Sequence, residues 1–305
     1  MAKESAKGGS GEMGRNRPAA GGRGSDVGEQ PVAVADPEPR LASVDQAEAQ
    51  RPFTLAIDIG GTGLKASVLD HAGAMVADRV RVPTTYPMPP TGDGGMVPAL
   101  VRLVSALPEA DRVSAGFPGM VRHGRVLSAP HFTTQGGPGT PLDPELAKAW
   151  NRFDLAGALE EALGKPTRVA NDADVQGAAV VAGKGLELVV TLGTGFGTAV
   201  FLDGRLLPHL EIAHQPFRKG ETYNQQLGER TRKEIGDERW NRRVRKAVET
   251  LDALLFFDHL YIGGGNARRV SRDRLGDYLR RTTAVDNTNG ILGGIKLWEG
   301  DHLGL

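Results

Sequence analysis

The sequence predicts an α/β protein of two lobes, and two observations carry this prediction. Short apolar stretches with strand character alternate with stretches of helical spacing along most of the chain. Two glycine-rich segments, residues 56–70 and 189–203, also share one pattern: an apolar strand, a Gly/Thr turn and a second apolar strand. We therefore expect a duplicated β-hairpin within an alternating α/β fold.

The two hairpins can be matched residue by residue. The matched pairs are Ile59 with Leu192, Gly60 with Gly193, Ala66 with Ala199, Leu69 with Leu202, and Asp70 with Asp203. Glycines in such turns accept a positive φ and let backbone N–H groups approach an anion closely. Ordinary hairpins are the alternative, because Gly-Gly and Gly-Thr-Gly are common turn sequences, but the matched flanks favour a pair of phosphate loops. Two such turns that face each other would hold a polyphosphate between them.

Other phosphate-binding patterns fit poorly. A P-loop needs Gly-Lys-Ser/Thr leading into a helix, whereas Lys65 is followed by Ala66 and a second strand. The dinucleotide fingerprint also leads into a helix, and the residues after Thr62 have strand character. The hairpins therefore indicate a different phosphate-binding fold.

Bulk composition narrows the class further. The chain carries 37 basic and 37 acidic side chains, which indicates neither a nucleic-acid-binding nor a membrane-surface protein. No stretch approaches the ~18 apolar residues of a membrane span. The absence of cysteine excludes disulfides, thiolate catalysis and cysteine-ligated zinc. We expect a cytoplasmic protein with neither nucleic acid nor membrane as a partner.

Residues 1–51 differ from the rest in composition. They are rich in Gly, Ala, Glu, Pro and Ser, contain no aromatic residue, and show neither strand nor helix periodicity. Such a segment cannot bury enough apolar surface to offset the entropy of ordering it, and it lacks the continuous apolar stretch of a secretion signal. We expect a disordered tail, which leaves about 250 residues for one large domain or two lobes.

Periodicity and turn residues predict the elements of the first half. Strands are expected over 53–59, 64–70, 75–82, 112–117, 125–129 and 167–170, helices over 96–107 and 155–163, and loops over 86–95 and 131–141. Pro118-Gly119 is a turn signal. Asp154 is a suitable N-cap for the helix that begins at Leu155, and Gly164 is a suitable stop.

The second half alternates in the same way. We expect a helix over 173–182, the second hairpin over 187–202 followed by a turn at Asp203-Gly204, a strand over 259–262 and a closing helix over 289–297. Trp240, Val244 and Leu251 fall on one face of a further helix. The stretch 230–246 is rich in Arg and Lys and could line a path for polyphosphate, but interleaved acidic residues favour a solvated helix face.

Six motifs occur in one order from residue 53 onward. They are residues 58–65, 117–119, 171–174, 191–197, 211–214 and 262–265. Together they resemble the ROK family of sugar kinases, which has the two-lobed, actin-like (ribonuclease-H-like) ATPase fold. The runs at 118–124 and 287–291 are similar to the branch of polyphosphate glucokinases. With this fold we expect a small lobe over residues 52–118, a large lobe over 119–288, and a C-terminal helix at 289–305 that packs back onto the small lobe.

The resemblance implies a glucokinase-like reaction, in which a phosphoryl group passes from ATP, polyphosphate or both to the 6-hydroxyl of glucose, with Mg²⁺. Asp172 would be the catalytic base, and Asp58 would hold Mg²⁺ through water. The residues expected to contact the sugar are Asn171, Glu211, His214, His131 and Gly119. Those expected to contact phosphates or nucleotide are Asp58, Gly60, Gly61, Thr62, Lys65, Gly193, Thr194, Gly195, Gly197, Gly263, Gly264 and Gly265.

The residues themselves leave alternatives open. Asp172 follows a short strand and opens a helix, so it can project into a cleft and accept a proton, but a helix-capping role fits at least as well. Asp58 could be a turn carboxylate, although its place beside a phosphate loop favours a metal ligand. Glu211 and His214 are three residues apart and could share one face of a turn, yet an exposed Glu and a packed His fit the same spacing. Asp174 is expected to be structural.

Two positions depart from the family's pattern: Ala213 stands where Gly is usual, and His131 where Asn is often found. Either could alter sugar preference or weaken binding. Relatives in which the histidine matching His214 binds zinc also have a cysteine cluster, so no zinc is expected here. The alternatives are therefore a sugar-binding regulator without turnover, or a kinase for another hexose such as mannose or an N-acetylated hexosamine. Residues 1–51 show no helix-turn-helix pattern, which disfavours a DNA-binding regulator. Members of the family are commonly dimers, so the resemblance leaves a homodimer as an open expectation.

Overall fold

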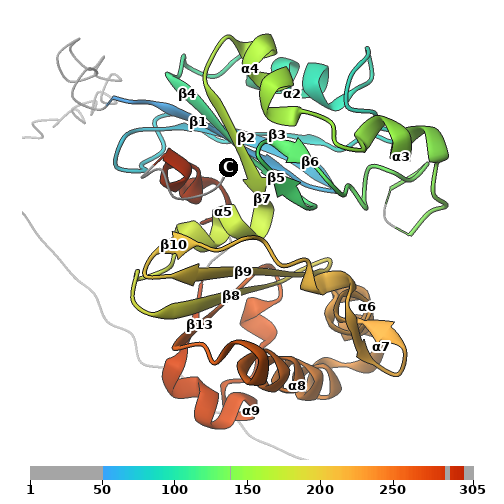
Figure 1. Cartoon of the computed structure of the whole chain (residues 1–305), viewed down its shortest axis with the longest axis vertical. Coiled ribbons are helices and arrows are strands. Elements are labelled where there is room, and N and C mark those ends of the chain that lie inside the picture. Colours follow the sequence, from blue (N-terminus) through green and yellow to red (C-terminus); the bar gives the residue numbers. More distant parts are fainter. Residues whose placement is uncertain (1–50, 138, 286–288, 299–305) are drawn as a thin grey trace, which may run out of the picture. The chain divides into compact units, whose positions relative to one another are not determined.

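The computed structural model describes residues 51–137, 139–285 and 289–298, and these contain two five-stranded sheets (Figure 1). The tail expected over 1–51 lies outside the described residues except for Arg51, as does the first part of the run at 287–291. Within the described ranges, no helix is both long and apolar enough to cross a membrane.

The first sheet joins an antiparallel three-stranded unit to two parallel strands, in the order β3-β2-β1-β4-β7. Its strands are β1 (Thr54–Ile59), β2 (Gly63–Leu69), β3 (Val80–Pro83), β4 (Arg112–Phe117) and β7 (Thr167–Asn171). β1 pairs antiparallel with β2 and parallel with β4, and β4 pairs parallel with β7. The central strands β1 and β4 are buried on both faces, which explains their nearly continuous apolar sequences.

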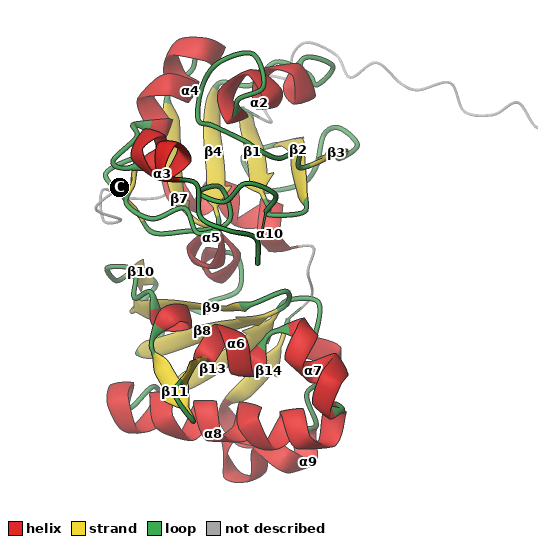
Figure 2. Cartoon of the chain, turned by 90° about the vertical axis from the view of Figure 1, so that its right-hand side faces the viewer, coloured by secondary structure: helices red, strands yellow, loops and turns green. Residues whose placement is uncertain are grey.

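The second sheet repeats this arrangement strand for strand, in the order β10-β9-β8-β13-β14 (Figure 2). Its strands are β8 (Leu186–Leu192), β9 (Phe196–Leu202), β10 (Arg205–Leu206), β13 (His259–Gly263) and β14 (Thr282–Ala284). β8 pairs antiparallel with β9 and parallel with β13, as β1 does with β2 and β4. The predicted α/β class and the duplicated hairpin are thus confirmed.

The two hairpins differ in the length of their turns. The first turn closes with a hydrogen bond from the N–H of Gly60 to the carbonyl of Gly63, at 3.0 Å. The second closes with a bond of the same length from Gly193 to Gly195. The second turn is therefore one residue shorter than the first, a difference that the sequence match does not include.

Beyond the turn, the matches predicted between β2 and β9 are wrong by one residue. Leu69 is fully buried, but Leu202 is 45 % exposed, and the residue of β9 that occupies the place of Leu69 is Phe201. Successive side chains of a strand point to opposite faces, so a shift of one residue exchanges buried and exposed positions. The same shift displaces the predicted pairs Ala66 with Ala199 and Asp70 with Asp203.

Helices α2 (Met96–Val104) and α4 (Leu155–Leu163) cover one face of the first sheet through a shared apolar core. The predicted ends of α4 are confirmed. Asp154 Oδ1 accepts the N–H of Gly157 at 3.0 Å, and Gly164 at the other end has a left-handed backbone with φ 64°.

Helix α8 (Asp237–Leu255) covers the outer face of the second sheet. The apolar face predicted from the spacing of Trp240, Val244 and Leu251 is buried against β8 and β13, as expected for an amphipathic helix. The opposite face of this sheet, which includes Phe201 and Tyr261, packs near the end of helix α5 (Asp172–Ala178).

Helix α5 lies between the two sheets, in contact with β4 of the first and β9 of the second (Figure 2). The closing segment, α10 (Asn289–Leu292) and η4 (Gly293–Trp298), packs on β1, β4 and α5, and Ser114 Oγ donates to the carbonyl of Gly294 at 2.6 Å. The chain leaves the first sheet only after β7, so the division between the sheets follows Asn171, whereas the sequence suggested a boundary after Pro118.

Several expected elements are shorter than predicted. The strand expected over 75–82 is only β3, the strand over 125–129 is reduced to β6, and the helix over 173–182 ends at Ala178. The helix ends early because the N–H groups of Ala182, Gly183 and Lys184 donate to the carboxylate of Glu187, at 2.7 to 3.1 Å, instead of to helix carbonyls. A local carboxylate thus competes successfully with the helical hydrogen bonds.

The other elements are short. They are β5 (Val121–Arg122), β6 (Arg125–Val126), α3 (Pro144–Trp150), η1 (Ile212–His214), β11 (Pro216–Arg218), β12 (Glu221–Thr222), α6 (Tyr223–Leu227), α7 (Glu229–Ile235), η2 (Ala267–Arg269), α9 (Arg272–Leu275) and η3 (Gly276–Arg281). Helix α3 was not predicted, although Asp143 caps it and Pro144 occupies its first turn. This Asp-Pro pair is a helix-start signal that the sequence offers.

Candidate active site

One cleft, with a volume of about 340 Å³, brings together nearly all the predicted site residues. Its walls include Asp58, Gly60, Gly61, Thr62, Lys65, Gly119, His131, Asn171, Asp172, Gly193, Thr194, Gly195, Gly197, Glu211, His214, Gly264 and Gly265. Gly263 is the exception among the predicted residues: it is the last residue of β13 and is buried within the sheet. Residues that are far apart in the sequence therefore meet in a single cavity.

The first hairpin turn is held from behind through its carbonyl groups. Thr84 Oγ1 donates to the carbonyl of Gly60 at 2.6 Å, and the hydroxyl of Tyr86 donates to the carbonyl of Gly61 at 2.8 Å. Neither donor borders the cleft. These bonds fix the turn while leaving its cleft side free. Tyr86 belongs to a segment that the sequence indicated only as a loop, and Thr84 lies between predicted elements.

Close approach, rather than a left-handed backbone, explains the glycine at position 61. Neither Gly60 nor Gly61 has a positive φ, contrary to the expectation from the sequence. A Cβ atom on Gly61 would lie 2.6 Å from Nδ1 of His131. The loop that carries His131 therefore packs directly on the turn, and a larger residue would push the two apart.

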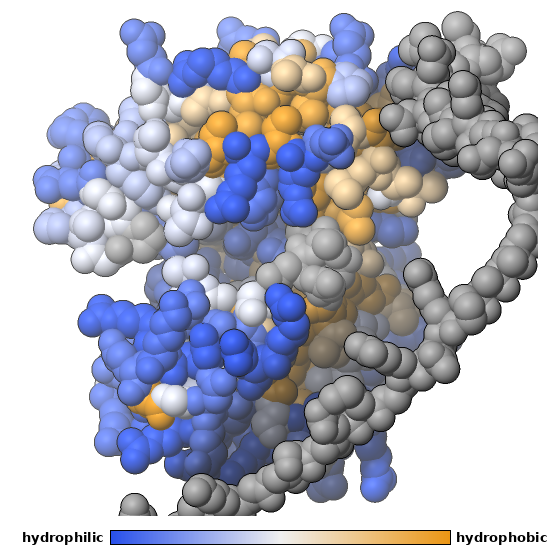
Figure 3. Space-filling model, turned by 180° about the vertical axis from the view of Figure 1, so that it is seen from behind, coloured by the Kyte–Doolittle hydropathy of each residue, from blue (hydrophilic) through white to orange (hydrophobic). Residues whose placement is uncertain are grey.

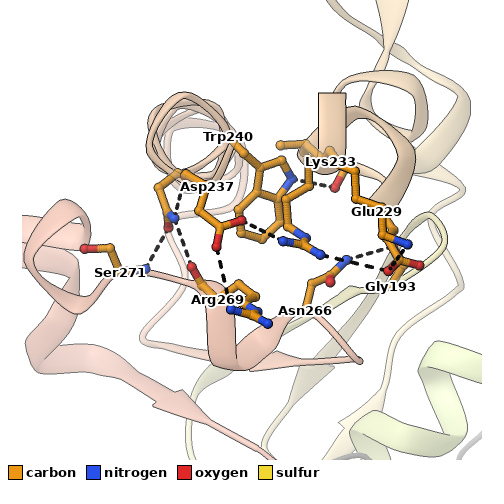
Figure 4. A network of polar contacts seen from close by, with 11 residues as sticks. Gly193, Glu229, Lys233, Asp237, Trp240, Asn266, Arg269 and Ser271 are labelled. Carbon is orange, nitrogen blue, oxygen red and sulfur yellow. Dashed lines mark hydrogen bonds and ion pairs between the residues drawn. The ribbon is translucent and has the colours of Figure 1, made fainter. Parts of the chain in front are cut away.

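The second hairpin turn is also held through backbone groups. The carbonyl of Gly193 accepts the N–H of Glu229 at 2.9 Å and Nδ2 of Asn266 at 3.1 Å (Figure 4). Oδ1 of Asn224 accepts the N–H of Phe196 at 2.8 Å. The sequence reasoning did not single out either asparagine, and the only signal for Asn266 is that it follows the glycine triplet directly.

A polar network supports this second turn and ties α7 and α8 to the segment after β13 (Figure 4). Arg232 of α7 donates to Asp237 of α8 at 2.6 Å. Asn241 of α8 donates to the carbonyl of Arg269 at 2.9 Å and accepts the N–H of Ser271 at 2.7 Å. The turn thus rests on elements that are fixed to one another.

Gly264 sits at the base of the second hairpin, where only glycine fits. Its φ is +86°, and a Cβ atom there would lie 2.3 Å from the carbonyl oxygen of Leu192. The N–H of Asn266 donates to the same carbonyl at 2.8 Å. Gly264 and Gly265 consequently border the cleft, while Gly263 remains part of the strand.

Asp58 and Lys65 bring charge to the first hairpin. They face each other across β1 and β2, and Nζ of Lys65 lies 2.6 Å from Oδ2 of Asp58. Mg²⁺ prefers carboxylate oxygens and retains several waters, so the carboxylate of Asp58, which borders the cleft, fits this ion as a ligand held through water. Across the described part of the chain, no three His, Cys, Asp or Glu side chains form a group that could hold a metal by themselves.

The junction of β7 and α5 places Asn171 and Asp172. Asn171 is the N-cap of α5: its Oδ1 accepts the N–H of Ala173 at 2.8 Å, and its Nδ2 donates to the carbonyl of Gly119 at 2.9 Å. Oδ1 of Asp172 also accepts the N–H of Ala173, at 2.8 Å. The N-cap position considered for Asp172 thus belongs to Asn171, and Asp172, the first residue of the helix, borders the cleft.

The pKa of Asp172 is strongly shifted. Burial, followed by the negative charge of Asp58, raises the pKa of Asp172 from 3.8 to about 7. Both effects disfavour the ionised carboxylate, and the hydrogen bond from Ala173 opposes them only in part. A carboxyl group with a pKa near neutrality, placed in a polar cleft, is typical of a group that exchanges protons with a substrate.

Glu211, His214 and His131 also border the cleft. Burial alone would raise the pKa of Glu211, but the hydrogen bond and charge of His209, and the charges of the other two histidines, lower it. Burial and the charge of His214 lower the pKa of His131. Within the described structure, Nδ1 of His131 is buried without a hydrogen-bond partner. The cleft thus offers an ionised carboxylate and the imidazole of His131, whose buried Nδ1 lies against Gly61.

Sequence reasoning missed other residues of the cleft. They are Pro118, Pro130, Gln176, Thr191, Phe196, Thr198, His209 and Asn224. Ala213, which the sequence analysis singled out, also borders the cleft. His209 is the most notable, because its Nδ1 lies 3.0 Å from Oδ1 of Asp174 and its Nε2 lies 3.8 Å from Oε2 of Glu211. The only signal in the sequence was a histidine two positions before Glu211.

The basic stretch at 230–246 does not border the cleft. Its side chains pair with acidic neighbours on the same helices, for example Arg230 with Glu234 at 2.9 Å and Arg242 with Glu238 at 2.8 Å. In the view from behind, the surface around these helices is mainly hydrophilic (Figure 3). These ion pairs favour the solvated helix face over a path for polyphosphate.

The fold and the cleft define the class of this protein. The sequence model of the ROK family matches residues 54–210, just over half of the chain, and the chain belongs to the ROK family. The resemblance drawn from the six motifs is thus confirmed, together with the fold that it implied.

Three relatives illustrate the likeness. Polyphosphate glucokinase of Mycobacterium tuberculosis (strain CDC 1551 / Oshkosh) is 27% identical over 276 residues, which cover 84% of this chain and 94% of the relative. The crystal structure of an inorganic polyphosphate/ATP-glucomannokinase from Arthrobacter sp. strain KM is 30% identical, covers 82% of this chain and 100% of its own, and has a TM-score of 0.65. A ROK family glucokinase from Streptomyces griseus, in complex with glucose and AMPPNP, is 18% identical over 80% of this chain and 98% of its own, with a TM-score of 0.60, and shows the shared fold alone.

Proposed function

We propose that this protein is a hexose kinase that transfers a phosphoryl group from ATP, polyphosphate or both to the 6-hydroxyl of glucose. The observation that carries the proposal is the place of Asp172. Its carboxyl group borders a cleft that also includes both glycine-rich turns and the cluster of Glu211, His214 and His131. Donor and acceptor groups of a phosphoryl transfer would therefore meet at one ionisable side chain.

The donor side of the proposal rests on the two hairpin turns. Their cleft sides are free because the carbonyls of Gly60, Gly61 and Gly193 are bound from behind. Catalysis of phosphoryl transfer depends mainly on positioning the phosphates and neutralising their charge. Lys65 would contribute positive charge. Mg²⁺ held through water by Asp58 would supply further neutralisation of the donor phosphates when bound.

The acceptor side rests on fixed polar groups. Polar sugars are bound by several well-placed donors and acceptors. Glu211, whose pKa is lowered, would accept hydrogen bonds from sugar hydroxyls, and the imidazole of His131, which also borders the cleft, would form one more. Gly119 and Asn171, which bond to each other, would form the wall beside the base.

The proton step belongs to Asp172. With a pKa of about 7, a large share of the molecules carry an ionised Asp172 at neutral pH. This carboxylate would take the proton of the 6-hydroxyl as the new O–P bond forms, while the bond from phosphorus to the bridging oxygen of the donor breaks. The electron pair of the broken bond leaves with the shortened donor.

Donor and hexose are the finer parts of the proposal. The names of the relatives support both ATP and polyphosphate as donors. Gly264 and Gly265 border the cleft and would face the nucleoside of ATP, whereas polyphosphate would need only the hairpins. Mannose is the second candidate acceptor, supported by the glucomannokinase relative and by His131 and Ala213, which differ from the pattern usual in the family.

A panel of donors and sugars tests the proposal. Formation of sugar 6-phosphate is measured for glucose, mannose and N-acetylmannosamine with ATP or polyphosphate in the presence of Mg²⁺. We expect turnover of glucose with at least one donor. Asp172→Ala should lower kcat by about 10²- to 10⁴-fold and leave glucose binding intact, because general-base assistance is worth that much. Asp93→Ala, which removes an exposed loop carboxylate, is the matched control.

Three results would revise the proposal. Binding of glucose without turnover by any donor would identify a sugar-binding regulator. Turnover of mannose or N-acetylmannosamine alone would change the substrate. Near-normal kcat in Asp172→Ala would remove Asp172 from the mechanism.

A further inference from the structure

His209 lies between two carboxylates at the edge of the cleft. Its side chain is only 6% exposed, Asp174 on one side is 4% exposed, and Glu211 on the other is 22% exposed. Each ring nitrogen faces a different carboxylate, Nδ1 at 3.0 Å from Asp174 and Nε2 at 3.8 Å from Glu211. Nδ1 is within hydrogen-bond distance of Asp174, whereas the 3.8 Å from Nε2 to Glu211 is an ion-pair distance, and a doubly protonated imidazole can serve both carboxylates at once.

The surrounding charges favour that doubly protonated form. Burial alone would lower the pKa of His209, but the hydrogen bonds and charges of Asp174 and Glu211 outweigh it and raise the pKa to about 10. The facing groups are Asp174 from α5, with Asp172 two residues earlier on the same helix, and Glu211 from the loop of His209 itself. His209 is therefore a cation across the physiological pH range.

The loop that carries His209 is anchored on two sides. Thr198 of β9 donates through Oγ1 to the carbonyl of Leu210 at 3.0 Å, which ties the loop to the second sheet. On the other side, the contact with His209 ties it to Asp174, which stands two residues after Asp172 on α5. One imidazole thus connects the loop that bears Glu211 to the helix that bears Asp172.

We propose that His209 is a positioning residue of the sugar site. By bridging Asp174 and Glu211, it directs the carboxylate of Glu211 toward the sugar hydroxyls and keeps the sugar-binding loop in register with the helix that carries Asp172. This inference rests on the proposed hexose kinase function and assigns to it a residue that does not itself touch the reacting atoms.

The alternative is that His209 merely fills space between α5 and the loop. A buried charge is costly unless it is fully paired, and a packing role would be served as well by an apolar residue of similar size. One cation lies between two carboxylates, and one of these, Glu211, borders the cleft. This arrangement indicates that the charge of His209 determines where the carboxylate of Glu211 points.

Kinetics of His209→Gln and Asp174→Asn test the proposal. His209→Gln removes the central cation of the bridge and Asp174→Asn removes the charge at one end. For each we expect the KM for glucose to rise about ten- to hundred-fold, since a hydrogen bond to a charged group is worth that range. The KM for the donor should not change. Because both substitutions break the same bridge, the double variant should be no worse than the more affected single variant. His259→Gln, which removes a histidine of β13 that bonds Thr283 outside the cleft, is the matched control.

A second measurement uses the wild-type chain and needs no turnover. In ¹⁵N-histidine-labelled protein, the ring signals that disappear in His209→Gln identify this residue, and we expect both of its nitrogens to be protonated at pH 8. A neutral ring at pH 8 would overturn the proposal, whether or not the variants fold.

The two readouts separate this inference from the proposed function. Should the wild type phosphorylate no hexose, the kinase proposal fails, and calorimetric binding of glucose to wild type and Asp174→Asn then decides the role of His209. Weaker glucose binding in Asp174→Asn supports the bridge. Equal losses for glucose and donor, a lower melting temperature alone, or no glucose binding by the wild type would overturn it.

Discussion

Asp58 and Lys65 form an ion pair of 2.6 Å one step before the turn of the first hairpin, and the equivalent pair in the second hairpin, Thr191 and Gly197, carries no charge. The second hairpin has no room for a lysine there, because a Cβ atom on Gly197 would lie 2.4 Å from Oγ1 of Thr191. The two copies have therefore kept the same strand pairing but acquired different chemistry. Under the proposed function, the first hairpin supplies charge and the second supplies backbone groups only.

Lys65→Met should weaken use of the donor more than binding of the sugar. The substitution keeps the length of the side chain but removes the cation that faces Asp58 and the phosphates. We expect the KM for the donor to rise about ten-fold or more, with a lower kcat, because charge-assisted contacts are worth roughly 1.5–3 kcal/mol. Initial rates at varied donor concentration measure the effect. Lys148→Met on the exposed side of α3 is the control, and equal donor kinetics in both variants would contradict the role of Lys65.

Asp172→Asn should stabilise the free protein, and increasingly so at higher pH. A carboxyl group whose pKa is raised from 3.8 to about 7 on folding stabilises fully below pH 4, and this contribution is lost as the pH rises through 7. The asparagine side chain does not ionise, so the variant does not lose stability in this way as the pH rises. At pH 8 we expect it to be more stable than the wild type by about 1–4 kcal/mol, or roughly 2–4 °C in Tm per kcal/mol. At pH 4 the difference should vanish.

Thermal melts of both proteins between pH 4 and 8, without donor or metal, provide the measurement. Asp93→Asn, in an exposed loop, should follow the wild type at every pH. A difference between wild type and Asp172→Asn that does not grow with pH would show that the pKa of Asp172 is not raised by folding.

Tyr86→Phe should loosen the first hairpin without removing any group from the cleft. The lost hydroxyl donates to the carbonyl of Gly61 at 2.8 Å, and one such bond is worth about 0.5–1.5 kcal/mol. We expect the KM for the donor to rise roughly three- to ten-fold, with a smaller change in the KM for the sugar. Tyr278→Phe removes the same atom far from the cleft and is the control. A donor KM equal to that of the control would show that the turn keeps its shape without this bond.

The sequence predicted the parts of the site that lie at the ends of buried strands. Asp58 is the last residue but one of an apolar strand, Asp172 follows another, and Gly193 follows a third, so the sequence could place each near a strand end. Asp58 and Asp172 lie at one edge of the first sheet because β1, β4 and β7 are parallel, and Gly193 of the second sheet borders the same cleft. Only Gly263, at the junction of strand and loop, was assigned to the wrong side of that boundary.

The supporting residues could not be predicted in the same way. Tyr86 bonds a residue 25 positions away, Asn266 one 73 positions away, and His209 one 35 positions away. In the first two cases the partner is a backbone carbonyl. Every residue has one, so such a contact leaves no pattern in the sequence. The one-residue offset between the hairpins could not be seen in the sequence either. Both turns consist of glycine and threonine, so a turn that is one residue shorter still shows the same motif.

Glu187→Gln should destabilise the connection between the two sheets. The carboxylate is 1% exposed and accepts three backbone N–H groups of residues 182–184 and the hydroxyl of Tyr261, at 2.7 to 3.1 Å. The NH₂ group of the glutamine side chain would face N–H and O–H donors that now have a carboxylate oxygen as acceptor. We therefore expect the free energy of unfolding to fall by about 3 kcal/mol, or Tm by roughly 6–12 °C. Hydrogen exchange should also become faster at 182–184 than elsewhere, because this segment depends on Glu187 for its bonds. Glu161→Gln on the exposed side of α4 is the control, and a similar Tm in both variants would show that the segment is held by other contacts.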